Sequence, residues 1–168
     1  MTAQENFCRR SARVVLIDEA DRVLLFRFHV DPEHPEGGHA WCTPGGGVED
    51  GESLVEAAAR ELHEETGLSV EPDVLGAKVA ETSGYADLGW AKGMFQDVFF
   101  HCRIATHRVD IDGQGADELR YHAGYRWWPL DELAASSETI YPLGLAELAA
   151  GLAAGRTPSE PVRLPWHH

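Results

Sequence analysis

The chain has 168 residues, 43% of them hydrophobic and 25% charged, which is typical of one globular domain with its own core. Its 28 acidic side chains outnumber the 14 basic ones and give a formal charge of −14. Because duplex nucleic acid is also anionic, this charge disfavours it as the main partner. No run of about 18 apolar residues occurs, so we expect no membrane-spanning helix.

The three cysteines are Cys8, Cys42 and Cys102. Their number is odd and none forms a Cys-x-x-Cys pair, so they predict neither a complete disulfide framework nor a zinc site. The N-terminal residues lack the long apolar segment of a secretory signal. We therefore expect free thiols and a cytoplasmic protein.

The first part of the chain predicts a β-hairpin followed by a loop. Residues 12–18 and 22–28 are aliphatic runs that predict two strands, joined by a polar turn at residues 19–21. Residues 29–39 are rich in Pro, Gly and charged side chains, which predicts a loop. A short strand is expected at residues 41–43.

A glycine-rich segment and a helix come next. The four glycines within residues 45–51 predict a flexible loop. A helix is predicted over residues 53–66, because Ser53 and Glu56 form a capping box at its start. Gly67 ends it, since glycine readily adopts the left-handed conformation of a helix C-cap.

The second half predicts more strands than helices, without regular alternation between them. We expect strands at residues 74–83, 96–104 and 125–128, a helical turn starting at Pro129, and a helix at residues 142–154. This order favours an α+β fold with a mixed sheet and helices on its faces. The predicted division is a flexible N-terminus at residues 1–10, one domain at 11–156 and a Pro-rich, irregularly packed tail at 157–168.

The predicted helix carries an unusual group of acidic side chains. Glu61, Glu64 and Glu65 stand at positions i, i+3 and i+4, which places them on one face. Their mutual repulsion would be offset by a hard divalent cation, since Mg²⁺ and Mn²⁺ prefer oxygen ligands. A solvated acidic face without a ligand is the alternative. Arg60 could pair with Glu52 or with Glu56.

Residues 46–68, GGVEDGESLVEAAARELHEETGL, resemble the Nudix box. That motif has Gly, five residues, Glu, seven residues, then Arg-Glu-apolar-x-Glu-Glu-x-Gly-apolar. Every specified position is filled here, by Gly46, Glu52, Arg60, Glu61, Leu62, Glu64, Glu65, Gly67 and Leu68. The order of predicted elements over residues 10–155 also resembles this family.

The resemblance implies an α/β/α sandwich around a mixed sheet. It also implies a pyrophosphohydrolase that uses Mg²⁺ or Mn²⁺ to cleave a phosphoanhydride bond in a nucleoside diphosphate-linked substrate. That small-molecule nucleotide would be a dinucleoside polyphosphate, ADP-ribose or a nucleotide sugar, or a modified nucleoside triphosphate. Many members of the family form homodimers.

The resemblance also implies roles for the box residues. Glu61, Glu64 and Glu65 would bind metal, with Glu64 and Glu65 the strongest catalytic candidates. The backbone at Gly45 and Gly46 would approach the pyrophosphate, and a carbonyl at Gly46 could lie near the metal.

Residues beside and beyond the box have implied roles too. Glu52 would be structural, held by Arg60. A general base would lie on the box helix or in a later loop, where Glu118 and Asp117 are the candidates. Tyr85, 17 residues after Leu68, resembles a marker of the diadenosine-polyphosphate branch and could stack on a base. A core or surface tyrosine is the alternative.

Other side chains outside the box give weaker signals. We expect four aromatic side chains to lie in the core or sheet rather than to stack on a base: Trp90, Phe95, Trp127 and Trp128. Three basic side chains could contact phosphates or only form surface salt bridges: Arg27, Lys92 and Arg126.

Two other functions remain open at this point. A catalytically idle Nudix module would bind a nucleotide and regulate a partner, although such modules usually have a degraded box. Isomerase chemistry on a prenyl diphosphate would need a catalytic cysteine, and neither Cys42 nor Cys102 establishes one.

Overall fold

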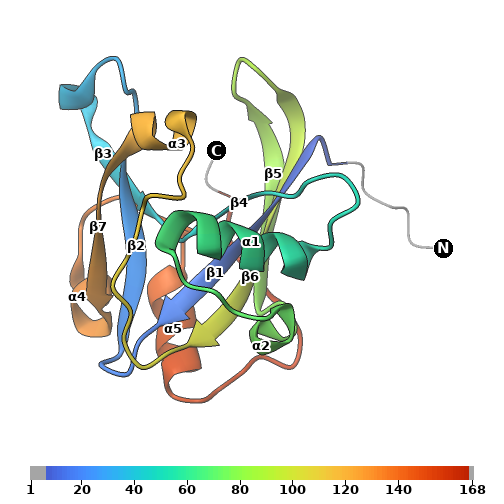
Figure 1. Cartoon of the computed structure of the whole chain (residues 1–168), viewed down its shortest axis with the longest axis vertical. Helices are drawn as coiled ribbons and strands as arrows, with labels where there is room; N and C mark the ends of the chain where they lie inside the picture. The colour runs from blue at the N-terminus through green and yellow to red at the C-terminus, as the bar shows by residue number, and fades with distance from the viewer. Residues whose placement is uncertain (1–6, 167–168) are drawn as a thin grey trace.

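The computed structural model of the chain describes residues 7–166, apart from the side chain of Asp117. Within this range nine strands form one sheet in the order β8-β3-β2-β1-β6-β5-β9, with β4 paired to β1 and β7 paired to β2 (Figure 1). The strands are β1 (Arg9–Ile17), β2 (Arg22–His29), β3 (His39–Cys42), β4 (Gly45–Gly47), β5 (Ala80–Asp87), β6 (Lys92–Arg103), β7 (His122–Pro129), β8 (Ile140–Tyr141) and β9 (Val162–Arg163). The helices are α1 (Leu54–Thr66), α2 (Pro72–Leu75), α3 (Ala116–Tyr121), α4 (Leu130–Ala135) and α5 (Leu145–Ala153).

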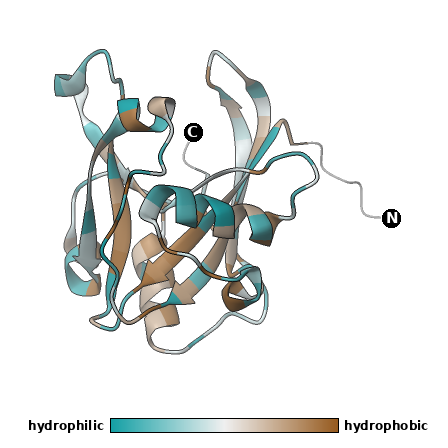
Figure 2. Cartoon of the chain, in the orientation of Figure 1, coloured by the Kyte–Doolittle hydropathy of each residue, from teal (hydrophilic) through white to brown (hydrophobic). Residues whose placement is uncertain are grey.

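The predicted α+β class is confirmed, because the sheet is mixed and helices cover both of its faces. Strand β1 runs parallel to β6 and antiparallel to β2. Its side chains alternate, so Val14 and Leu16 pack toward α1 while Val15 and Ile17 pack toward α5. Hydrophobic residues accordingly concentrate on the central strands (Figure 2). None of the helices in the described part of the chain has the length and apolar sequence needed to span a membrane.

The predicted helix after the glycine-rich segment is confirmed as α1. Ser53 Oγ accepts a hydrogen bond from the Glu56 N–H at 3.2 Å, and the Glu56 carboxylate accepts one from the Ser53 N–H at 3.1 Å. Gly67 ends the helix in a left-handed conformation, with φ of 77°. Because Glu56 is engaged in this cap, Glu52 remains as the partner for Arg60.

The glycine-rich segment is not the flexible loop that was predicted. Residues Gly45–Gly47 form β4, which pairs antiparallel with β1. The strands approach so closely that a Cβ at Gly45 would lie 2.4 Å from the Ala12 carbonyl oxygen. Glycine here permits close backbone packing, and this pairing fixes the start of the acidic box against the sheet.

Several predicted boundaries are wrong. The strand expected at residues 74–83 is replaced by α2 followed by β5, because Pro72 at the start of α2 favours a helical turn. The helix expected at residues 142–154 begins only at Leu145, after Gly144 with φ of 88°. Strands β6 and β7 begin earlier than predicted, and the loop at 29–39 contains a short 3₁₀ helix.

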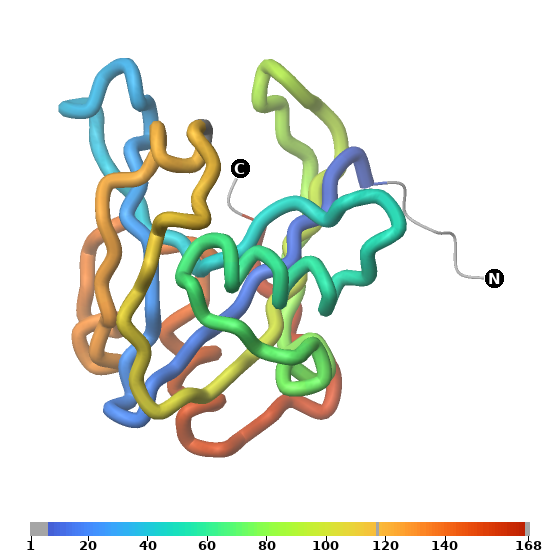
Figure 3. The backbone as a smooth tube through the Cα atoms, in the orientation of Figure 1, coloured from blue at the N-terminus to red at the C-terminus, as the bar shows by residue number. Residues whose placement is uncertain are grey.

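The two ends of the chain are more regular than expected. Strand β1 begins at Arg9, while residues 1–6 of the predicted flexible N-terminus lie outside the described residues. The tail returns to the sheet edge, where β9 pairs parallel with β5 (Figure 3). Leu164 is buried, and the Trp166 Nε1–H donates to the Tyr85 carbonyl at 3.0 Å. Residues 167–168 lie outside the description.

Candidate active site

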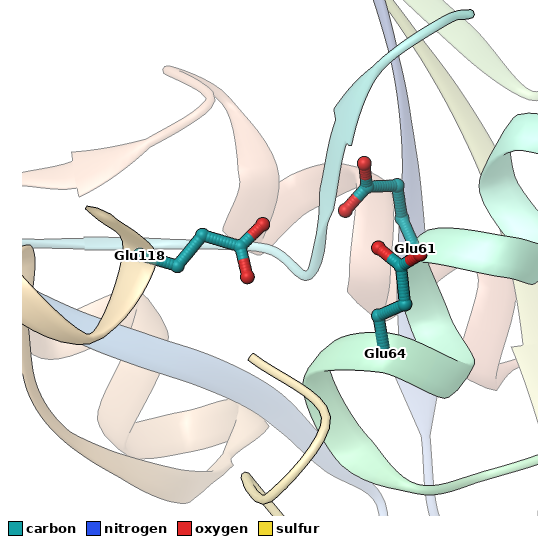
Figure 4. Close-up of side chains that lie close together, drawn as sticks. All are labelled: Glu61, Glu64 and Glu118. Atoms are coloured by element: carbon teal, nitrogen blue, oxygen red, sulfur yellow. The ribbon is translucent and has the colours of Figure 1, made fainter. Parts of the chain in front are cut away.

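Three glutamate carboxylates meet beside the C-terminal half of α1. Glu61 and Glu64 extend from α1, and Glu118 points toward them from α3 (Figure 4). One oxygen atom from each residue lies within 4.8 Å of the other two. Glu61 is only 6% exposed, and its Oε2 has no hydrogen-bond partner. Burial raises the pKa of Glu61, although Arg60 beside it acts in the opposite direction.

Arg60 connects these carboxylates to the rest of the box. Its guanidinium donates to both oxygens of Glu52 at 2.8 and 2.9 Å, and to the Gly47 carbonyl at 2.9 Å. It also donates to Glu61 at 3.0 Å and to Glu64 at 3.2 Å. The hydrogen bonds from Arg60 lower the pKa of Glu52. One cation therefore orients two carboxylates of the cluster and ties α1 to β4.

Glu65 lies on the same helix but is not one of the three clustered carboxylates. Its Oε2 accepts a hydrogen bond from the Gly45 N–H at 2.9 Å. Burial raises the pKa of Glu65 to about 8. A Cβ at Gly46 would lie 2.6 Å from the Glu61 carboxylate, so this position requires glycine. The box glycines thus let two glutamates pack directly against the backbone of β4.

A pocket of about 640 Å³ opens beside the acidic cluster. It lies between β2 with α3 on one side and β1 with β6 on the other, and both Glu65 and Glu118 line it. Its volume falls in the range of about 300–1,000 Å³ that is common for small-molecule sites. Three aromatic side chains, Phe26, Phe28 and Tyr121, contribute to its walls and suit a flat ring.

The acidic cluster has the chemistry of a divalent-cation site. Its donor atoms are all carboxylate oxygens, the type that Mg²⁺ and Mn²⁺ prefer. The unpartnered Glu61 Oε2 supplies an independent sign, because a buried carboxylate oxygen normally has a partner. Glu61, Glu64 and Glu118 therefore fit a hard divalent cation.

Comparison with known proteins decides the family. The sequence matches the NUDIX domain family over residues 8–146. The chain belongs to the Nudix family. It is 31% identical over 132 residues to the RNA pyrophosphohydrolase of Azorhizobium caulinodans, which covers 72% of this chain and 77% of the relative. The RNA pyrophosphohydrolase of Rhodopseudomonas palustris is 33% identical over 134 residues, covering 74% of this chain and 79% of the relative. This Nudix protein is a hydrolase that acts on acid anhydrides in phosphorus-containing compounds.

Solved structures show the same Nudix fold. The MutT protein from Methanosarcina mazei Go1 superimposes with a TM-score of 0.63 and 20% identity, over 93% of this chain and 100% of that one. The E. coli dihydroneopterin triphosphate pyrophosphohydrolase gives a TM-score of 0.61 and 18% identity, over 87% and 95% of the two chains. The α/β/α sandwich expected from the box is thereby confirmed.

The other predicted site residues of this Nudix hydrolase are scattered. Glu118 lies in α3, which replaces the predicted loop, and the Asp117 side chain is outside the described residues. Tyr85 is 60% exposed on β5 and is not part of the pocket lining. Trp90, expected in the core or sheet, is 67% exposed in the turn before β6 and stacks under Arg9.

The remaining side chains with weaker signals divide between core, pocket and surface. Phe95 and Trp128 are buried, as predicted. Arg27 lines the pocket, whereas Arg126 pairs with Glu132 at 2.6 Å.

The pocket floor was not predicted from the sequence. It consists of Arg13 from β1, Asp97 from β6 and Thr43 from the connection between β3 and β4. One feature of the sequence pointed to Arg13 as a pocket residue: it is a charged side chain within the mainly aliphatic run of residues 12–17. Cys42 also lines the pocket, but burial raises the pKa of its thiol to about 11. A thiol that stays protonated at neutral pH gives no support to the isomerase alternative.

Proposed function

We propose that this Nudix hydrolase cleaves a phosphoanhydride bond in a nucleoside diphosphate-linked substrate, with Mg²⁺ or Mn²⁺ as its cofactor. One observation carries the proposal: Glu61, Glu64 and Glu118 converge beside a nucleotide-sized pocket, with a buried oxygen of Glu61 left unpartnered. Dinucleoside polyphosphates, ADP-ribose or nucleotide sugars, and modified nucleoside triphosphates are the substrate candidates.

The divalent cation would neutralise phosphate charge and activate a water molecule. Glu61, Glu64 and Glu118 would hold the cation, and Arg60 fixes the orientation of Glu61 and Glu64 by donating a hydrogen bond to each. Glu65 and Glu118 both line the pocket, so either carboxylate can take the proton of the attacking water. Glu65→Gln and Glu118→Gln distinguish the two candidates for the base. Loss of Glu65 as the base would lower kcat without weakening cation binding, whereas Glu118→Gln should also weaken cation binding, because Glu118 belongs to the acidic cluster.

The box backbone and a basic side chain serve the phosphate end of the substrate. Gly45 and Gly46 have no side chain that would separate the phosphates from the backbone of β4. Arg27 lines the pocket and supplies positive charge toward the phosphate chain.

The 5′ end of RNA is a second substrate candidate, favoured by the RNA pyrophosphohydrolases among the relatives. A 5′-triphosphate of a single strand presents the same phosphoanhydride bonds as a free nucleotide. The charge of −14 disfavours a long nucleic-acid footprint, so we expect contact with the first nucleotides only.

Phosphate release tests the proposal. The panel contains ADP-ribose, diadenosine polyphosphates, nucleotide sugars, nucleoside triphosphates and a 5′-triphosphorylated oligoribonucleotide, each with Mg²⁺ and with Mn²⁺. Glu64→Gln should abolish turnover, while Glu56→Gln on the same helix should retain it, since Gln also completes a capping box. Nucleotide binding without turnover above the Glu64→Gln background would instead support the idle regulatory module.

We also propose a cytoplasmic location. Cys8, Cys42 and Cys102 are all free cysteines, which suits a reducing compartment. The homodimer stays a prediction, and size-exclusion chromatography with light scattering measures it directly.

A further inference from the structure

The pocket floor holds an ion pair with unused hydrogen-bonding capacity. Arg13 of β1 and Asp97 of β6 have side chains that are 24% and 17% exposed, and both line the pocket. The Arg13 Nε and Asp97 Oδ1 atoms are 3.9 Å apart, which is too far for a hydrogen bond. Within residues 7–166, the Asp97 carboxylate accepts no hydrogen bond.

Thr43, beside Arg13, has a hydroxyl group that also lacks a hydrogen-bond partner. The residue is 1% exposed, and its Oγ1 is buried without a hydrogen-bond partner. Its carbonyl oxygen accepts a hydrogen bond from Arg13 Nη1 at 2.9 Å, so the three residues lie together. Buried polar atoms without partners are rare in proteins, and Thr43 lines the pocket together with Arg13 and Asp97.

The negative charge of Asp97 repels an anionic substrate, unless the part of the substrate beside Asp97 carries hydrogen-bond donors. An ionised carboxylate only accepts hydrogen bonds, and its two oxygens can accept from two neighbouring N–H groups. The aromatic walls formed by Phe26, Phe28 and Tyr121 favour a planar ring in the pocket. The edge of a nucleobase combines adjacent N–H donors with a planar ring, so it suits both the Asp97 carboxylate and the aromatic walls.

Guanine has the edge that matches these groups. Its N1–H and 2-amino group are adjacent donors for the two oxygens of Asp97, and its O6 is an acceptor next to them for Arg13 or the Thr43 hydroxyl. Adenine offers only its 6-amino group as a donor and would place its N1 acceptor against the second oxygen of Asp97, a repulsive contact between two acceptors that guanine avoids. We propose that Asp97, with Arg13 and Thr43, selects guanine as the base of the substrate. This inference rests on the proposed function.

The test compares kcat/KM for GTP, ITP and ATP with Mg²⁺ in the wild type and in Asp97→Asn. A bidentate contact to a base discriminates by about 1–3 kcal/mol, so kcat/KM for GTP should exceed that for ATP by about 5- to 150-fold. ITP lacks the 2-amino group and should fall between them. Asp97→Asn should reduce kcat/KM for GTP and bring the GTP/ATP ratio close to one. Asp87→Asn is the matched control, since Asp87 is exposed in the β5–β6 hairpin and should leave the ratio unchanged.

Three results would overturn the inference. Equal turnover of GTP, ITP and ATP by the wild type would do so without any variant, and it remains decisive if Asp97→Asn does not fold. An equal loss on all three nucleotides in Asp97→Asn would place Asp97 on the ribose or only beside Arg13. If none of the three triphosphates is turned over, the panel of the proposed function tests the hydrolase separately, and calorimetric binding of GDP against ADP decides base recognition alone. Tighter binding of GDP would support the inference, and equal binding would overturn it.

Discussion

Replacing Arg60 by Ala tests how much the stability of the acidic box depends on the guanidinium of Arg60. The Arg60 side chain is 23% exposed, and its guanidinium donates to Glu52, Glu61, Glu64 and the Gly47 carbonyl. Its removal leaves the buried Glu61 carboxylate beside Glu64 without a counter-charge. Breaking a buried pair costs about 3–5 kcal/mol, and the partial exposure of Arg60 and Glu64 reduces this, so we expect the free energy of unfolding to fall by about 2–4 kcal/mol. At about 2–4 °C per kcal/mol for this chain length, Tm should drop by about 4–16 °C.

Scanning calorimetry at pH 7 measures this loss, first with EDTA and then with Mg²⁺. The cation should restore part of the Tm of Arg60→Ala, because it supplies the missing positive charge to Glu61 and Glu64. Arg108→Ala is the control, since Arg108 is exposed and has no ion pair among the described residues. Equal Tm values for the two variants, or a loss below about 1 kcal/mol in Arg60→Ala, would refute the role assigned to Arg60.

Two further predictions concern the box backbone and the pH dependence of stability. Gly46→Ala should lower kcat by about 100-fold, because the new Cβ displaces the Glu61 carboxylate 2.6 Å away, whereas Gly151→Ala in open space should retain activity. Wild-type kcat in Gly46→Ala would contradict this. Burial lowers the pKa of His101 below 6.5, and its ring lies 2.9 Å from the Val15 carbonyl. The unfolded chain then binds more protons below pH 6.5, so stability should fall with decreasing pH by at most about 1.4 kcal/mol per pH unit from this group. Urea unfolding at pH 5.5 and 7.5 should show a smaller fall in His101→Gln, and parallel falls would count against His101.

Structural features that depend on interactions between residues close in the sequence could be predicted from the sequence. The Ser53–Glu56 capping box and Gly67 specify the bounds of α1, because each interaction forms within one helical turn. The pairing of Arg60 with Glu52 belongs to the same 23-residue motif. Strand boundaries were predicted less well. Residues 74–79 have a mixed pattern that suits a strand, yet Pro72 starts a helical turn there and β5 begins only at Ala80.

The sequence by itself determined the family, the class of fold and the acidic residues of α1. Only the tertiary structure decided how those residues are arranged: Glu61 and Glu64 lie with Glu118 from α3, while Glu65 accepts a hydrogen bond from the Gly45 N–H. It also decided that Asp97 shares the pocket floor with Arg13, although 83 positions of the chain lie between them. The physical reason is that helix periodicity and capping act over a few residues. Pocket residues are instead brought together by strand pairing across the sheet, and local sequence does not specify which strands become neighbours.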